Sequence, residues 1–231
     1  MNEAMLHNAY GDHFLTDAFA AGHLINKEDV MAMFRANVKD PNNPKSNAKR
    51  DKLCDAVATE VFKDAGTAAY ISRFDGKFVF WWAIDNAGDF STVLKKIDNK
   101  KPGVVANAIA LTVHDKLNHS ETIEVKSKNH PEPWMLSGDM TLNKTSKQEA
   151  RKAVAQSQVN VMNAKGIAGP LDLPAMFQKV WDIVPQPTGQ GTAAVKQEVD
   201  KGTDPTDRQT IEAVAKKIIE ARELLMVKAV E

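Results

Sequence analysis

The amino-terminal helical segment constrains the fold most, because it places groups with metal-binding chemistry among apolar residues. Apolar side chains recur at helical spacing over residues 2–25, and the stretch "GDHFLTDAFAAGH" carries His13, Asp17 and His23. On a helix of about 3.6 residues per turn, His13 and Asp17 lie one turn apart on the same face. That face also carries Leu6, Ala9, Ala20 and Leu24. We therefore expect both side chains to point towards the core, where a carboxylate needs a partner or a metal ion.

Two interpretations of this segment are open. In the first, His13 and Asp17 pair with each other inside a helical core. In the second, they hold a metal ion, and His23 lies near enough to reach a second ion beside the first. Imidazole and carboxylate groups are both good zinc ligands. Gly22, which precedes His23, allows another group to approach the backbone closely.

The spacing His-x3-Asp-x5-His resembles the metal-binding helix of the superfamily that contains zinc-dependent bacterial phospholipases C and single-strand-specific zinc nucleases. The wording "HFLTDAFAAGH" is similar to a phospholipase-like bacterial branch of that superfamily. The resemblance implies a cluster of up to three zinc ions. In that cluster His13 and Asp17 would hold one ion, Asp17 would bridge to another, and His23 would bind a further ion.

Two later stretches extend the resemblance. His114-x3-Asn118 is similar to the family's second ligand helix, with asparagine where the family has aspartate, and a neutral amide binds zinc less well than a carboxylate does. Trp134 followed by Gly138 and Asp139 also resembles the phospholipase-like branch. Asp139 has two interpretations, as a group at the metal site or as the cap of the next segment.

The resemblance implies metal-dependent hydrolysis of a phosphodiester, with a phospholipid head group favoured over a nucleic acid. Asp17 is then the catalytic candidate, and the zinc ligands are His13, Asp17, His23, His114 and Asn118. The alternative is a catalytically inactive helical scaffold or interaction protein that keeps the family's helix. Family members use a processed amino terminus as a ligand, and this chain offers only His7 ahead of His13.

Composition and the amino-terminal residues limit the functions and the cellular compartment that we expect. Thirty basic and thirty acidic residues cancel, which argues against a general nucleic-acid-binding protein. The single cysteine, Cys54, lies on an apolar helix face and is expected to be buried. Residues 1–6 lack the basic start and apolar run of a signal peptide, and no run reaches the roughly 18 apolar residues that cross a bilayer. We expect a soluble chain that begins in the cytoplasm, with export by a non-classical route as the alternative.

The periodicity predicts a mainly α fold, resembling the zinc phospholipase C fold, with one or two small β-hairpins. Asn26 is expected to cap the second helix, and Ser146 with Glu149 is expected to form a capping box. Hairpins are predicted around Asp75-Gly76 and over residues 121–139. The aromatic residues near the first hairpin either pack within it or meet a lipid surface. Helices are expected over residues 2–25, 27–38, 48–65, 102–117, 146–165, 175–184 and 206–230.

Three regions are expected along the chain. Residues 1–185 form the helical domain with the metal site. Residues 186–205 lack a periodic apolar face and are predicted to be a flexible linker. Residues 206–231 form an amphipathic carboxy-terminal helix, which either docks back on the domain or binds a protein partner or a second copy.

Overall fold

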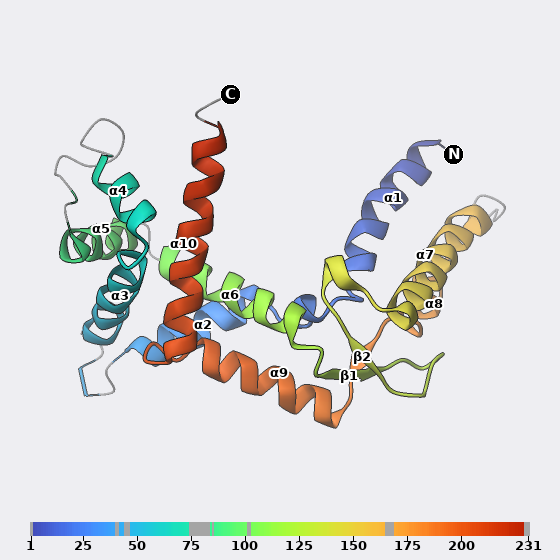
Figure 1. Ribbon diagram of the computed structural model, residues 1–231. Coiled ribbons are helices and arrows are strands. Elements are labelled where there is room, and N and C mark those ends of the chain that lie inside the picture. Colours follow the sequence, from blue (N-terminus) through green and yellow to red (C-terminus); the bar gives the residue numbers. More distant parts are fainter. Residues whose placement is uncertain are drawn as a thin grey trace. The chain divides into compact units, whose positions relative to one another are not determined.

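The computed structural model describes residues 2–39, 42–43, 47–73, 84, 86–100, 103–164 and 169–228 (Figure 1). Within these ranges the chain forms ten α-helices, two 3₁₀ turns and three short strands, so the predicted mainly α fold is confirmed. None of the described helices is long and apolar enough to cross a membrane.

The chain divides into two compact units, and this division differs from the expected one at residue 185. Unit 1 combines Met1–Ile25 with His114–Glu198, and unit 2 combines Asn26–Val113 with Val199–Glu231. Each unit is therefore built from segments that are distant in the sequence. The histidine-bearing amino terminus belongs with the second half of the chain.

Unit 1 is organised around the long helix α7 (Lys144–Ala164). The helices α1 (Asn2–Asp17) and α8 (Leu173–Trp181) both pack against it, as Figure 1 shows in blue and orange. The core of this unit is formed by Phe19, Ala150, Ala153, Ile183 and Val184.

The first helix ends earlier than expected, which corrects two predictions. It stops at Asp17, and a separate 3₁₀ turn, η1 (Ala21–Leu24), carries His23. The side chain of His13 is 71% exposed and that of Asp17 is 27% exposed, so the expectation that both point into the core is wrong. The reason is tertiary: α7 covers the face that carries Asn8, where Ser157 donates a hydrogen bond to the Asn8 Oδ1 atom at 3.0 Å.

A small antiparallel sheet completes unit 1 and confirms the hairpin predicted over residues 121–139. Strand β1 (Ile123–Lys126) pairs with β2 (Trp134–Leu136), with Ile123 opposite Leu136. The short strand β3 (Gln186–Pro187) pairs with the other edge of β1, so the strand order is β2-β1-β3. The apolar residues of β1 are buried, as alternation in a one-sided sheet requires.

The cap of α7 differs from the predicted capping box. Asn143 holds the cap position, because its Oδ1 atom accepts a hydrogen bond from the Ser146 backbone N–H at 2.9 Å. Ser146 is instead buried inside the helix, where its hydroxyl accepts from the Trp134 indole N–H at 3.2 Å. Glu149 pairs with His130, whose Nδ1 lies 3.1 Å away, rather than with the helix start.

The predicted flexible linker is corrected by helix α9 (Gly189–Gly202). Thr188 supports its start, because the hydroxyl accepts a hydrogen bond from the Gly191 N–H at 3.1 Å. Gly191 packs against the backbone of Glu124, so closely that a Cβ atom there would collide with the carbonyl oxygen. Because α9 makes this contact through a glycine, its sequence lacks the apolar side chains that recur once per helical turn. The sequence pattern therefore predicts a linker instead of a helix.

Unit 2 is built on α3 (Ala48–Val61), against which α5 (Ala87–Lys100) and α10 (Arg208–Lys228) pack. The predicted carboxy-terminal helix is thus present and docks on α3 through buried residues that include Val214 and Ala215. The buried face of α3 consists of Arg50, Leu53, Cys54, Val57, Ala58 and Val61.

The remaining helices of unit 2 confirm one local prediction and correct another. The Asn26 side chain caps α2 (Lys27–Val38), as predicted, by accepting from the Glu28 N–H. The prediction of a first hairpin strand before Asp75-Gly76 is wrong, because residues 70–73 belong to helix α4 (Ala65–Arg73). The rest of that predicted hairpin, residues 74–83, lies outside the described residues. Helix α6 (Val104–Ser120) begins two residues later than expected and continues past Leu117.

Candidate metal site

Two histidines that are 91 residues apart in the sequence meet in unit 1. The Nε2 atoms of His23, in η1, and His114, in α6, lie 3.4 Å apart. Their rings stand edge to face, with centroids 4.8 Å apart and an interplanar angle of 88°. His23 is exposed and the His114 side chain is 27% exposed, so solvent and small solutes reach this pair.

Asn118 fixes the position of the turn that carries His23. Its Oδ1 atom accepts a hydrogen bond from the Gly22 backbone N–H at 2.6 Å. A Cβ atom at Gly22 would lie 2.7 Å from that same oxygen, and one at Gly138 would lie 2.6 Å from the Asn118 carbonyl oxygen. Only glycine therefore fits at Gly138, where the neighbour is backbone, and a side chain at Gly22 would displace the Asn118 amide. The amide oxygen that the resemblance assigns to zinc is engaged in holding η1 against α6.

Asp115 lies on the other side of the His114 ring. Its Oδ1 atom is 3.3 Å from the His114 Nδ1 atom. A carboxylate at Nδ1 favours the tautomer in which Nδ1 carries the proton, which leaves the Nε2 lone pair available to a metal ion. The motif resemblance does not include Asp115, although the dipeptide His114-Asp115 is the sequence signal that indicates this role.

The distance within the histidine pair suits a metal ion. Tetrahedral zinc with bonds of about 2.0–2.1 Å to nitrogen places two ligating nitrogens about 3.3–3.4 Å apart. The observed separation of the two Nε2 atoms is 3.4 Å. The separation of the two nitrogens is therefore compatible with one bridging ion. The same distance also allows a long hydrogen bond in which one ring nitrogen donates and the other accepts.

A cluster of three zinc ions fits less well. His13 and Asp17 form an exposed pair on α1 with 4.0 Å between Nε2 and Oδ2. Among the described residues, no group of three or more His, Cys, Asp or Glu side chains converges on a common point. The structure thus brings together His23 and His114, and it holds Asn118 beside them in a supporting role.

Cys54 and Glu149 are among the buried titratable residues, and neither is placed for catalysis. Burial raises the pKa of the Cys54 thiol to about 11, so this group is not a nucleophile at neutral pH. Burial also raises the pKa of Glu149, but hydrogen bonds from Lys152 and His130 outweigh it and hold the pKa below its ordinary value. The Glu149 carboxylate links α7 to the loop after β1 and is structural.

Comparison with known proteins assigns no relatives: no family model matches the chain, and no curated protein or solved structure is significantly similar to it. The resemblance to the zinc phospholipase C and nuclease superfamily therefore rests on the motif residues alone.

Proposed function

We propose that unit 1 binds one divalent transition-metal ion, zinc by its ligand chemistry, between His23 and His114 and uses it to hydrolyse a phosphodiester. The observation that carries this proposal is the 3.4 Å separation of the two Nε2 atoms across 91 residues of sequence. The substrate class follows from the resemblance, which implies phosphodiesters and, among them, phospholipids.

The residues of the proposed site would have different roles. His114 and His23 would hold the ion, and Asp115 would keep the His114 Nε2 atom directed at it. Asn118 would hold the His23 turn in place through the Gly22 N–H. A zinc ion bound there supplies Lewis acidity, which polarises a phosphoryl oxygen of the substrate. The exposed edge of the pair leaves room for the substrate to approach.

The test compares hydrolysis with and without metal. Protein stripped with a chelator is assayed on bis(p-nitrophenyl) phosphate and on phosphatidylcholine micelles, before and after zinc is restored. We expect zinc-dependent hydrolysis that His23→Ala and His114→Ala each abolish. Asp115→Asn should reduce the zinc affinity or the rate about 10–100-fold, because it removes the group that orients His114.

His119→Ala is the matched control, because His119 lies on the same helix and its ring Nδ1 contacts the Asp115 carbonyl oxygen instead. It should leave zinc binding and rate unchanged. Hydrolysis that persists in the double variant His23→Ala/His114→Ala would refute the proposed site.

A non-catalytic interaction role is the second candidate, and one observation favours it. Leu6, Tyr10 and Phe14 lie one turn apart on α1 and are 71%, 70% and 58% exposed. A stripe of exposed apolar side chains at this spacing is typical of a helix that contacts a partner. Zinc binding by the histidine pair without hydrolysis of either substrate would favour this role over the enzyme.

A further inference from the structure

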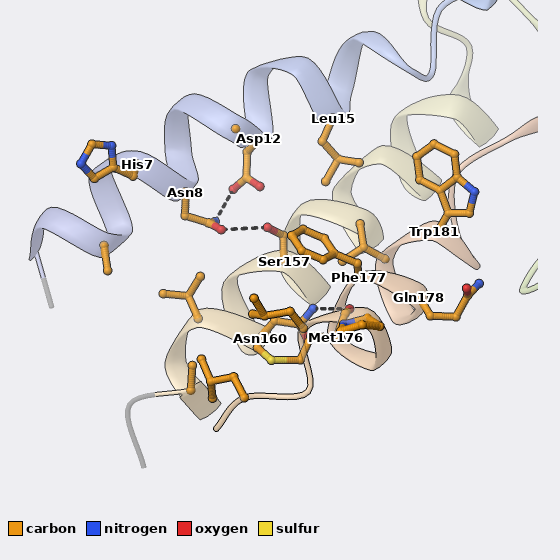
Figure 2. A pocket seen from close by; sticks show the side chains of 18 residues that line it. His7, Asn8, Asp12, Leu15, Ser157, Asn160, Met176, Phe177, Gln178 and Trp181 are labelled. Carbon is orange, nitrogen blue, oxygen red and sulfur yellow. Dashed lines mark hydrogen bonds between the residues drawn. The ribbon is translucent and has the colours of Figure 1, made fainter. Parts of the chain in front are cut away.

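Three helices of unit 1 enclose a groove of about 820 Å³, which the site above does not use (Figure 2). Its volume falls in the range of pockets that bind small organic molecules, about 300–1,000 Å³. The walls come from α1, α7 and α8, and all of the lining residues belong to unit 1. The apolar lining includes Leu15, Val161, Leu171, Leu173, Phe177 and Trp181.

Helix α8 turns its apolar residues towards open space. None of its residues is buried, and Phe177 and Trp181 are 70% and 60% exposed. Figure 2 shows both rings beside the groove, with Leu15 of α1 extending towards them. The apolar face of a helix in a folded domain is normally covered. Among the described residues, none buries this face of α8 in the region that the groove occupies.

Gly11 contributes to the open space of the groove. It lies within α1 and lines the groove, although glycine inside a helix is less favourable than alanine. A Cβ atom added there would meet no packing neighbour within 4 Å, in contrast to Gly22 and Gly138. The packing of the protein itself thus does not require glycine at this position. The missing side chain keeps one wall of the groove open.

The polar groups of the groove indicate an uncharged occupant. The Asn8 amide donates to Asp12 at 2.9 Å, and the Asn160 amide donates to the Met176 carbonyl oxygen at 2.7 Å. These groups have partners before any ligand arrives. Among the described residues no lysine or arginine lines the groove, and its one carboxylate, Asp12, is only 9% exposed. An anionic ligand would meet that carboxylate, and the imidazole of His7 is the one basic side chain among the described lining residues.

We propose that this groove binds the alkyl chain of an uncharged single-chain lipid, with the lipid head at the open mouth. The proposal stands on the groove alone and does not depend on metal binding or hydrolysis. It differs from a helix-docking surface because the occupant is a narrow chain that enters beside Gly11.

The test uses 1-monolauroylglycerol as the probe, below its micelle concentration, with the full chain and titration calorimetry. The wild-type chain should bind it, and binding should shift part of the emission of the four tryptophans to shorter wavelength because the Trp181 ring becomes covered. Gly11→Leu should weaken binding at least tenfold by filling the groove, and Gly11→Ala should have a smaller effect. Both variants should melt no lower than wild type, since both residues favour a helix over glycine, so lost binding is not lost folding.

Tyr10→Leu is the matched control, because Tyr10 is the neighbouring exposed residue of α1 and does not line the groove. It should bind as wild type does, and laurate, the anion of the same chain length, should bind more weakly than the neutral lipid. Unchanged binding by Gly11→Leu, tighter binding of laurate, or no binding of either lipid would overturn the proposal. A wild-type dimer that Gly11→Leu converts to a monomer would also overturn it, because the occupant would then be a second copy.

Discussion

The two units use their apolar residues differently. In unit 2 the central helix α3 is covered by α5 and α10, and Leu53 and Val61 are almost completely buried. In unit 1 the helix α8 has no buried residue. Among the described side chains, the exposed large hydrophobic residues lie in unit 1 with the exceptions of Met33 and Leu111. Among the described residues, the apolar side chains of unit 2 are thus mostly buried, whereas unit 1 leaves more apolar side chains exposed.

The largest expected effect is on stability. Leu53→Ala should lower the free energy of unfolding by about 2–5 kcal/mol, because Leu53 is 1% exposed and its removal leaves a cavity. Phe177→Ala removes a larger side chain that is 70% exposed, and it should cost less than about 1 kcal/mol. Urea unfolding followed by circular dichroism measures both. Equal losses of unfolding free energy in the two variants would contradict the difference between the covered helix α3 of unit 2 and the exposed helix α8 of unit 1.

A smaller effect concerns acid stability, where the units also differ. Glu149 in unit 1 is buried and has its pKa held below the ordinary value, and Asp55 in unit 2 is half exposed with its pKa lowered by hydrogen bonds from Lys95 and Ser91. A depressed folded-state pKa gives stability that is present above the ordinary carboxyl pKa, about 4–4.5, and is lost as pH falls through the folded value.

We therefore expect the melting temperature of the wild-type chain to fall below about pH 4.5. Glu149→Gln should reduce this pH dependence more than Asp55→Asn does, because surrounding water weakens the Asp55–Lys95 pair. Melting curves from pH 3 to 7 compare the three proteins. A larger change for Asp55→Asn would contradict the structural role given to Glu149.

Local chemistry explains the parts of the fold that the sequence predicts well. The cap at Asn26, the alternation in β1 and the buried face around Cys54 all follow from neighbouring residues. The end of α1 does not, because the Ala21 N–H donates to the Ser137 carbonyl oxygen from a distant segment. Helix α9 was missed for a related reason, since its contact at Gly191 has no apolar side chain to reveal it.

The candidate site also has parts that the sequence predicts and parts that it does not. His23 and His114 were named from motif resemblance, and the structure places them together. The support from Asp115 and Asn118 depends on how η1 meets α6, which spacing along one helix does not reveal. The inward orientation predicted for His13 failed because a helix period defines a face without telling which face is covered. The groove beside Gly11 forms where three helices meet, so no pattern along the sequence predicts it.

The most direct test of the central claim is the number of zinc ions that the chain binds, determined by elemental analysis after equilibrium dialysis of the wild type and three variants. We expect one ion per chain, lost in His23→Ala and in His114→Ala but retained in His13→Ala. Loss of zinc in His13→Ala, together with its retention in His23→Ala, would contradict the account and move the metal site to α1.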